Sequence, residues 1–377
     1  MENKSLIIND NLIIKKDAQA HFENPAYFPI LQQIKDDNER NNQYHFHNFS
    51  DIEMIYYYVH RKTHVRENEE NKRGTKKEYI RNLLQLYSYL LECQDQLKQD
   101  IPDFKGDSLF KNLYPRHIRN YHEFLAQAPL GRGGKPYSDY TLQSKTAIIK
   151  SFFTWLEDVG YIHRPLAAEI KRVKIREESK PDRDLYYHEV VQIINFYKDH
   201  PLLYGLLTTL MITGLRIEEI ANAEWKDISY DAHKNAYFLK GIGKRNKPFL
   251  KAIAPTYFER IKTFRKRRGL PTELNPLDET PVFATRNRKK YTYKNLSRYV
   301  VTSIEKTGLP FVKERKTRIT PHSFRHAFAI YLYKLGNDIY YIQRELGHSD
   351  PKTTAIYLEG LMKKENSAGL QIKDDAF

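Results

Sequence analysis

Near its C-terminal end the chain carries a dense series of helix start and stop signals, which constrain its local structure more than any other feature. Each start is a threonine or aspartate of the type that caps a helix, and each stop is a glycine. The starts are Thr320, Asp338 and Asp350, and the stops are Gly336 and Gly347. Proline follows the first and the last start, which favours a helical first turn at both places. The sequence therefore predicts three short helices joined by tight turns.

Polar side chains of a particular kind lie at the ends of these predicted helices. His322 and Arg325 are three residues apart, on one face of the first turn, where backbone N–H groups are unpaired and the helix dipole is positive. His348 follows the second helix, and Tyr357 lies about two turns into the third. An imidazole and a guanidinium at a helix start can bind phosphate. A capping histidine, a surface arginine and a core tyrosine would explain the same residues one at a time.

A further arginine, Arg216, lies far upstream in the sequence Thr-Gly-Leu-Arg (213–216). Two guanidinium groups can hold the non-bridging oxygens of one phosphate, and a tyrosine hydroxyl can attack its phosphorus. Because the pKa of tyrosine is about 10, attack at neutral pH needs a nearby base or positive charge. Together, Arg216, Arg325 and Tyr357 indicate DNA strand exchange through a protein–phosphate ester.

The charge of the chain favours a polyanionic partner. Lys and Arg number 62 against 47 Asp and Glu, a formal net charge of +15. Such a surplus is typical of proteins that bind nucleic acid or an acidic membrane. No apolar stretch approaches the ~20 residues of a membrane-spanning helix, and the N-terminus does not resemble a signal peptide. The single cysteine, Cys93, excludes disulfides within one chain and fits a reducing cytoplasm.

Apolar periodicity and composition divide the chain into two larger domains and three shorter segments. In chain order, the five parts are an N-terminal extension at 1–45, a helical domain at 46–169, a basic linker at 170–184, a second domain at 185–360 and a polar tail at 361–377. The extension is either an accessory DNA-binding module or a strand that packs on the rest of the protein. The tail is either disordered or docks on a neighbouring protomer.

The second domain mixes helices with strands. An antiparallel pair is predicted at 236–239 and 249–254, with a third short strand at 281–283. The fold is therefore predicted to be mainly α with a small antiparallel β-sheet.

Basic side chains away from these motifs are candidates for contact with DNA phosphates. One, Lys145, lies on the expected polar face of a helix in the first domain; the others lie in the linker and are Lys171, Arg172, Lys174 and Arg176. Contacts of this kind give affinity without sequence information. A solvated surface explains the same lysines.

The motifs follow the order and spacing of the tyrosine recombinases, also called phage integrases, and the chain resembles this family over roughly residues 72–360. The matching segments are residues 213–220, 243–247, 322–326, 346–349 and 353–357. The resemblance implies a helical core-binding domain and a catalytic domain that form a C-shaped clamp on duplex DNA. Phe324 stands where leucine is more usual, and Arg245 stands where glycine often follows the lysine of this motif.

The resemblance also implies how the phosphate is held. Arg216 and Arg325 would hold the non-bridging oxygens of the scissile phosphate, and His348 would donate a hydrogen bond to it. Glu219 would orient Arg216 from behind. Since cationic side chains balance the charge of the transition state, no metal and no cofactor are expected.

The same resemblance assigns the bond-breaking groups. Tyr357 would be the nucleophile, and His322 the general acid/base. Lys244, in the turn between two strands, would protonate the leaving 5′ oxygen, although Lys240 and Lys247 lie on the same hairpin.

The implied activity is that of a site-specific recombinase, an integrase or transposase of a bacterial mobile element. The implied partners are double-stranded DNA with a recombination site, further copies of the chain (two per site, four in the synapse) and a directionality factor. Resolution of dimers by a Xer-like enzyme and relaxation by a type IB topoisomerase are alternatives with the same chemistry.

Two alternatives of other classes are a non-catalytic DNA-binding regulator and a metal hydrolase. His322 and His326 are four residues apart, as in zinc-binding helices, and His348 could be a third ligand. Ser323 follows His322, however, so that the His-Glu-x-x-His signature is absent.

Overall fold

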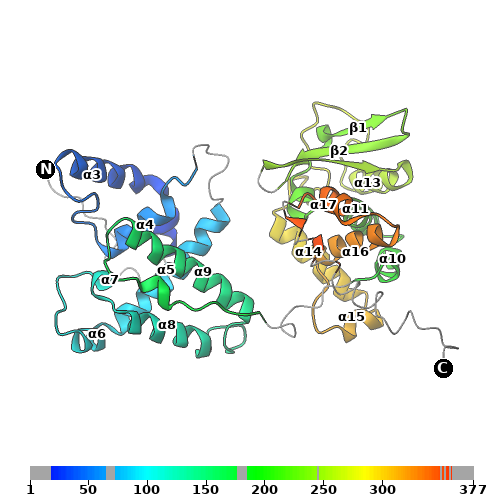
Figure 1. Ribbon diagram of the computed structural model, residues 1–377. Helices are drawn as coiled ribbons and strands as arrows, with labels where there is room; N and C mark the ends of the chain where they lie inside the picture. The colour runs from blue at the N-terminus through cyan, green and yellow to red at the C-terminus, as the bar shows by residue number, and fades with distance from the viewer. Residues whose placement is uncertain are drawn as a thin grey trace, which may run out of the picture. The chain divides into compact units, whose positions relative to one another are not determined.

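The computed structural model describes residues 18–64, 73–175, 185–243 and 246–348, together with residues 350, 351, 354, 355 and 358. The chain divides into two compact units, Met1–Lys180 and Pro181–Phe377 (Figure 1). The division falls within the segment 170–184, where the sequence predicts a linker. Each unit has a hydrophobic core of its own.

The first unit is helical throughout the residues that the structure describes. Its α-helices are α2 (Ala18–Glu23), α3 (Phe28–Arg40), α4 (Asp51–His60), α5 (Arg73–Glu92), α6 (Gln94–Asp100), α7 (Leu109–Asn112), α8 (Pro115–Gln127) and α9 (Asp139–Asp158). Proline begins α8, and the Ser138 hydroxyl accepts a hydrogen bond from the Thr141 N–H at the start of α9.

The core of the first unit is rich in aromatic side chains. Helix α4 contributes Tyr56, Tyr57 and Tyr58, all of them buried. Phe22 of α2 and Leu31 of α3 belong to the same core. Residues 18–40 therefore pack as part of the helical unit, whereas residues 1–17 of the N-terminal extension lie outside the described residues.

The second unit combines helices with one small sheet. Its elements are α10 (Tyr187–Phe196), α11 (Leu203–Thr213), α12 (Ile217–Asn222), β1 (Ile228–Asp231), β2 (Ala236–Ile242), β3 (Pro248–Ile253), α13 (Pro255–Arg267), α14 (Tyr293–Lys306), α15 (Pro310–Glu314), α16 (Pro321–Lys334) and α17 (Ile339–Leu346). Figure 1 shows the sheet at one end of this unit, with α11, α13 and α17 beside it. No helix in the described ranges has both the length and the apolar character that crossing a bilayer requires.

The third strand of the sheet is not the predicted one. The sheet has the order β1-β2-β3 and both pairs are antiparallel, so that its third strand is Ile228–Asp231. The segment 281–283 makes an isolated bridge from Pro281 to Glu224, and the Val282 N–H bonds to the Ala223 carbonyl. Its apolar side chains are buried because the segment pairs with the loop that precedes β1, and not because it joins the sheet.

Helix α11 ends in a turn that only glycine fits. Gly214 has φ +58°, and a Cβ atom built on it would lie 2.3 Å from Cδ1 of Phe328 on α16. The absence of a side chain lets the backbone pack directly on the aromatic ring. The chain then turns into α12, and Arg216 becomes the residue that precedes its first turn.

Candidate active site

A polar pocket of about 220 Å³ lies in the second unit, where α12, the turn between β2 and β3, α16 and the end of α17 meet. Its lining includes the charged residues Arg216, Glu219, Lys247, Lys251 and Arg325. Four segments that are far apart in the sequence thus contribute to one cationic depression.

Arg216 is fixed by the carboxylate of Glu219. One oxygen of Glu219 accepts the backbone N–H of Arg216 at 2.7 Å, and the other accepts Nη1 of its guanidinium at 2.9 Å. The Glu219 side chain is 7% exposed, whereas that of Arg216 is 30% exposed. A Cβ on Gly243 would lie 2.6 Å from Oε1 of Glu219, so glycine lets the hairpin approach this carboxylate. Arg216 is thereby oriented while its guanidinium stays accessible from the pocket.

Arg325 is buried and connects two helix ends. Its Nη1 donates to the Gly214 carbonyl at 2.7 Å, and its Nη2 donates to the Leu346 carbonyl. Both carbonyls lie at helix C-termini, where backbone oxygens lack intrahelical partners. One guanidinium therefore joins the segment that leads into Arg216 to the segment that leads into His348.

His348 follows the left-handed Gly347 that ends α17, and its side chain is buried. Nδ1 lies 2.9 Å from Oγ1 of Thr354. The pKa of His348 is lowered to about 3 by burial first, and then by electrostatic interaction with Arg325, Arg216, His322 and Lys247. Its imidazole is therefore neutral at physiological pH.

His322 lies in the first turn of α16, as predicted, and is half-buried. Its ring centroid is 5.0 Å from that of His326. The Ser323 hydroxyl accepts the Thr320 N–H at the helix start. Within the described part of the chain, no three His, Cys, Asp or Glu side chains gather in a way that could hold a metal ion.

Three of the predicted functional residues, Lys244, Tyr357 and Arg176, lie outside the described residues. On either side of Lys244, Gly243 and Lys247 line the pocket. The roles of Lys244 and Tyr357 stay predictions.

The predicted DNA contacts differ in exposure. Lys171, Arg172 and Lys174 are exposed and follow the last 3-10 turn of the first unit without regular structure. Lys145 is only 4% exposed, contrary to the expected polar face. It lies three residues after Leu142 and four before Ile149, at the spacing of the inner face of α9.

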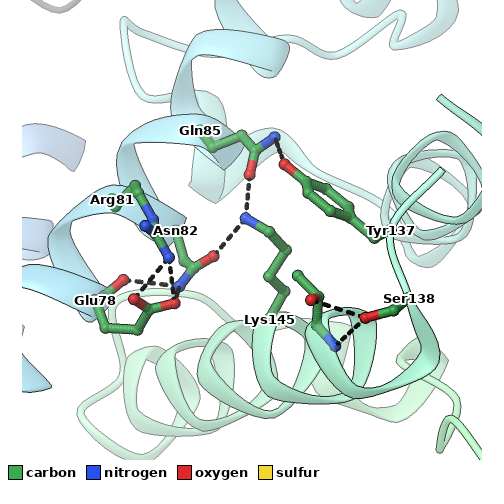
Figure 2. Close-up of polar contacts among 8 residues, drawn as sticks. Glu78, Arg81, Asn82, Gln85, Tyr137, Ser138 and Lys145 are labelled. Carbon is green, nitrogen blue, oxygen red and sulfur yellow. Dashed lines mark hydrogen bonds and ion pairs between the residues drawn. The ribbon is translucent and has the colours of Figure 1, made fainter. Parts of the chain in front are cut away.

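Figure 2 shows how Lys145 is held. Its Nζ donates to Oδ1 of Asn82 at 2.7 Å and to Oε1 of Gln85 at 2.6 Å, both on α5, and lies 4.7 Å from the ring centroid of Tyr137. Burial lowers the pKa of Lys145 to about 8. The ammonium thus links α9 to α5, and its contact with DNA stays a prediction.

Sequence reasoning missed one buried cation in the pocket. Lys251 of β3 is 7% exposed, and its Nζ bonds to the carboxylate of Glu345 at 2.6 Å and to the backbone carbonyl of Glu345. The available signal was strand alternation, which puts Lys251 on the same face as Phe249 and Ile253.

Comparisons with known proteins identify similar sequences. The sequence model of the phage integrase family matches residues 183–364. The tyrosine recombinase XerS of Lactococcus lactis subsp. cremoris (strain MG1363) is 27% identical over 325 residues, which cover 77% of this chain and 88% of XerS. A tyrosine recombinase of Thermosipho africanus (strain TCF52B) is 24% identical over 310 residues, which cover 81% of this chain and 94% of that protein.

Solved structures share the fold. XerH site-specific recombinase, in a post-cleavage complex with palindromic difH substrate, has a TM-score of 0.59 and 17% identity, with 95% of this chain and 98% of that chain covered. The Tn1549 transposon integrase in complex with circular intermediate DNA has a TM-score of 0.51 and 16% identity, with coverage of 81% and 93%.

Proposed function

We propose that this chain, which belongs to the tyrosine recombinase (phage integrase) family, is a site-specific recombinase. In this proposal it acts through a 3′-phosphotyrosyl intermediate. Enzymes of this family cleave and rejoin DNA through a tyrosine. The observation that carries the proposal is that Arg216 and Arg325 line one pocket, and that both arginines and His322 lie close enough to His348 to lower its pKa. This arrangement joins segments separated by more than a hundred residues of sequence.

In the proposed reaction, the scissile phosphate enters the pocket beside Arg216, which is accessible, and Arg325, which lies behind it. The Tyr357 oxygen attacks phosphorus and gives its proton to His322, while the bond from phosphorus to the 5′ oxygen breaks and Lys244 protonates that oxygen. The guanidinium groups stabilise the charge that develops on the equatorial oxygens. Attack by a second 5′-hydroxyl reverses the steps, and the energy of the phosphoester is kept.

His348 acts in this scheme as a neutral hydrogen-bond donor. With the Thr354 hydroxyl donating to Nδ1, Nε2 carries the ring proton and donates a hydrogen bond to a phosphate oxygen. The low pKa of His348, about 3, fits this role, because a group that stays neutral does not exchange protons with the substrate.

The same proposal covers the assembly on DNA. Lys171, Arg172 and Lys174 contact the phosphates of the bound duplex. Two copies bind each site and four form the synapse, as the dimer and tetramer complexes of lambda integrase suggest by analogy. Directionality factors, a docked tail and a role for residues 1–45 stay predictions.

The biological context has two candidates. Integration or transposition of a bacterial mobile element is supported by the similarity of fold to the Tn1549 transposon integrase. A Xer-like role is supported by the relatives named XerS, which this chain matches over most of their length. Sequencing the DNA ends recovered from covalent complexes would separate the two. A Xer-like role predicts one site that is shared by chromosome copies, whereas a mobile-element role predicts the two ends of the element.

A nicked suicide substrate tests the chemistry. The wild-type chain and the control Tyr340→Phe, which changes an exposed tyrosine of α17, should form a covalent DNA adduct, whereas Tyr357→Phe should form none. An adduct that persists with Tyr357→Phe would overturn the nucleophile. Adduct formation that is lost in the presence of a chelator would favour the metal-dependent alternative.

A further inference from the structure

Lys251 occupies a position in β3 where the fold calls for an apolar side chain. It pairs with Leu239 of β2, and it shares a face of the sheet with Ile253. Leu239 is 2% exposed and Ile253 is 0% exposed, so the neighbours of Lys251 are fully in the core. A buried ammonium loses its hydration, and that loss must be offset by specific acceptors.

The acceptors of Lys251 belong to the end of α17. Nζ bonds to the carboxylate of Glu345 at 2.6 Å and to its backbone carbonyl, and it lies 5.9 Å from the ring centroid of Phe328. The next carbonyl, that of Leu346, accepts from Arg325. Two cations on different elements, β3 and α16, therefore bind consecutive carbonyls at the C-terminus of one short helix.

This double attachment lies next to the proposed chemistry. His348 is two residues beyond Leu346, and only Gly347 separates it from the helix end. A helix of eight residues has little stability of its own, so its end takes the position that its tertiary contacts impose. Among the charged side chains that line the pocket, the Glu345 carboxylate is compensated by Lys251, as the Glu219 carboxylate is by Arg216.

We propose that Lys251 and Glu345 are positioning residues that fix the end of α17 and thereby hold His348 against the scissile phosphate. The proposal rests on the proposed function, because it assigns His348 to the phosphate. Stability alone does not explain Lys251, since replacing a buried ion pair by a well-packed apolar side chain is often neutral or stabilising. A displacement of about 1 Å at a reacting group, in contrast, can slow a reaction by about 100-fold.

The test uses the full chain and single-turnover cleavage of a nicked duplex at saturating DNA. Lys251→Met should cleave at least about tenfold more slowly, with DNA affinity within about twofold of wild type, although removal of one partner of a buried ion pair is expected to lower the melting temperature. Lys251→Arg should recover part of the rate, because it restores a cation. The matched control, Lys262→Met, removes an ion-paired lysine of α13 that bonds to Glu259 at 2.9 Å, and it should cleave like wild type.

A double-mutant cycle shows whether Lys251 acts through His348. In a His348→Gln background, Lys251→Met should cause no further loss of rate, because the group that it positions is gone. An undiminished loss in that background, or a Lys251→Met single variant that cleaves at the wild-type rate, would overturn the inference. If Lys251→Met folds poorly, Glu345→Gln applies the same test, since it keeps the backbone acceptor and removes the carboxylate.

Failure of this inference is distinguishable from failure of the proposed function. Absence of any adduct with wild type, or its persistence in Tyr357→Phe, contradicts the proposed function itself. A normal adduct with wild type and equal cleavage rates for wild type and Lys251→Met contradict only the positioning role.

Discussion

Each unit buries a lysine, and the two lysines are held in different ways. Lys145 donates to the neutral amide oxygens of Asn82 and Gln85, and thereby links α9 to α5 (Figure 2). Lys251 donates to a carboxylate and a carbonyl at the end of α17. Burial lowers the pKa of both, but at Lys251 the charge and hydrogen bond of Glu345 oppose the shift.

The difference indicates two uses of buried charge. In the helical unit the cation joins two long helices and so specifies how they pack. In the second unit the cations Lys251 and Arg325 bind carbonyls at helix ends beside the pocket. We therefore expect the buried cations Lys251 and Arg325 to control the rate of cleavage, the buried cation Lys145 to control stability, and the exposed linker cations to control affinity.

The largest expected effect is that of Arg325→Lys. Lysine keeps the charge but cannot donate to the Gly214 and Leu346 carbonyls and to a phosphate in the fork geometry of guanidinium. Cleavage of the nicked substrate should fall by about 100-fold or more. The control Arg318→Lys changes an exposed arginine of the same unit and should cleave normally. Normal cleavage by Arg325→Lys would break the distinction between the two units.

The next effect concerns affinity alone. A triple alanine variant of Lys171, Arg172 and Lys174 should bind all DNA sequences more weakly. The logarithm of its association constant should also fall less steeply with the logarithm of the salt concentration, by about 0.9 in slope for each lost phosphate contact. The rate of cleavage at saturating DNA should stay within about threefold of wild type. Binding titrations at several salt concentrations measure the slope, with Lys98→Ala and Lys105→Ala as exposed lysine controls from the same unit. An unchanged slope would remove the linker from the interface.

A smaller effect is expected for the stability of Lys145→Met. The pKa of Lys145 is about 8 in the folded chain and about 10.5 when unfolded, so between these values the unfolded chain binds more protons. Stability of wild type relative to Lys145→Met should therefore rise from pH 8 to pH 10.5, by at most about 3 kcal/mol. Melting temperatures of both proteins across this range provide the measurement. A difference that does not vary with pH would mean that the lysine titrates normally.

A further effect is expected in acid. Because the pKa of His348 falls from 6.5 to about 3 on folding, the unfolded chain binds more protons between these values, and stability is lost as the pH falls below 6.5. His348→Gln should lose less stability than wild type over this interval. Between pH 6.5 and 8 the cleavage of both should depend on pH in the same way, since His348 is neutral there. If the cleavage rate of wild type changes with pH in this range and that of His348→Gln does not, the role of His348 as a neutral donor would be contradicted.

The sequence predicts helix ends better than long-range contacts, for a physical reason. Caps act within one turn, and Asp338 indeed accepts the Tyr341 N–H at 2.8 Å where the sequence indicates a helix start. Strand β1 has only four residues, too few to show a recognisable pattern in the sequence. The short apolar run at residues 282 and 283 predicts a strand, because a buried loop segment and a buried strand have the same apolar composition.

The candidate site shows the same limit. The motifs that carry Arg216, His322 and Arg325 are contiguous in sequence, so that the residues are found from their text. The acceptors of Arg325 at Gly214 and Leu346, and the pairing of Lys251 with Glu345, depend on how distant elements meet. A lysine in a row of core-facing strand residues is the one sign of such a contact that the sequence offers.

The contact between Gly214 and Phe328 restricts how lineages of this protein can diverge. With φ +58° and an aromatic carbon where a methyl group would stand, a lone Gly214→Ala substitution is opposed twice, by backbone strain and by collision. Substitution at these two positions must begin at Phe328, with a residue smaller than phenylalanine. The two positions are therefore expected to co-vary among descendants, with loss of the ring preceding loss of the glycine.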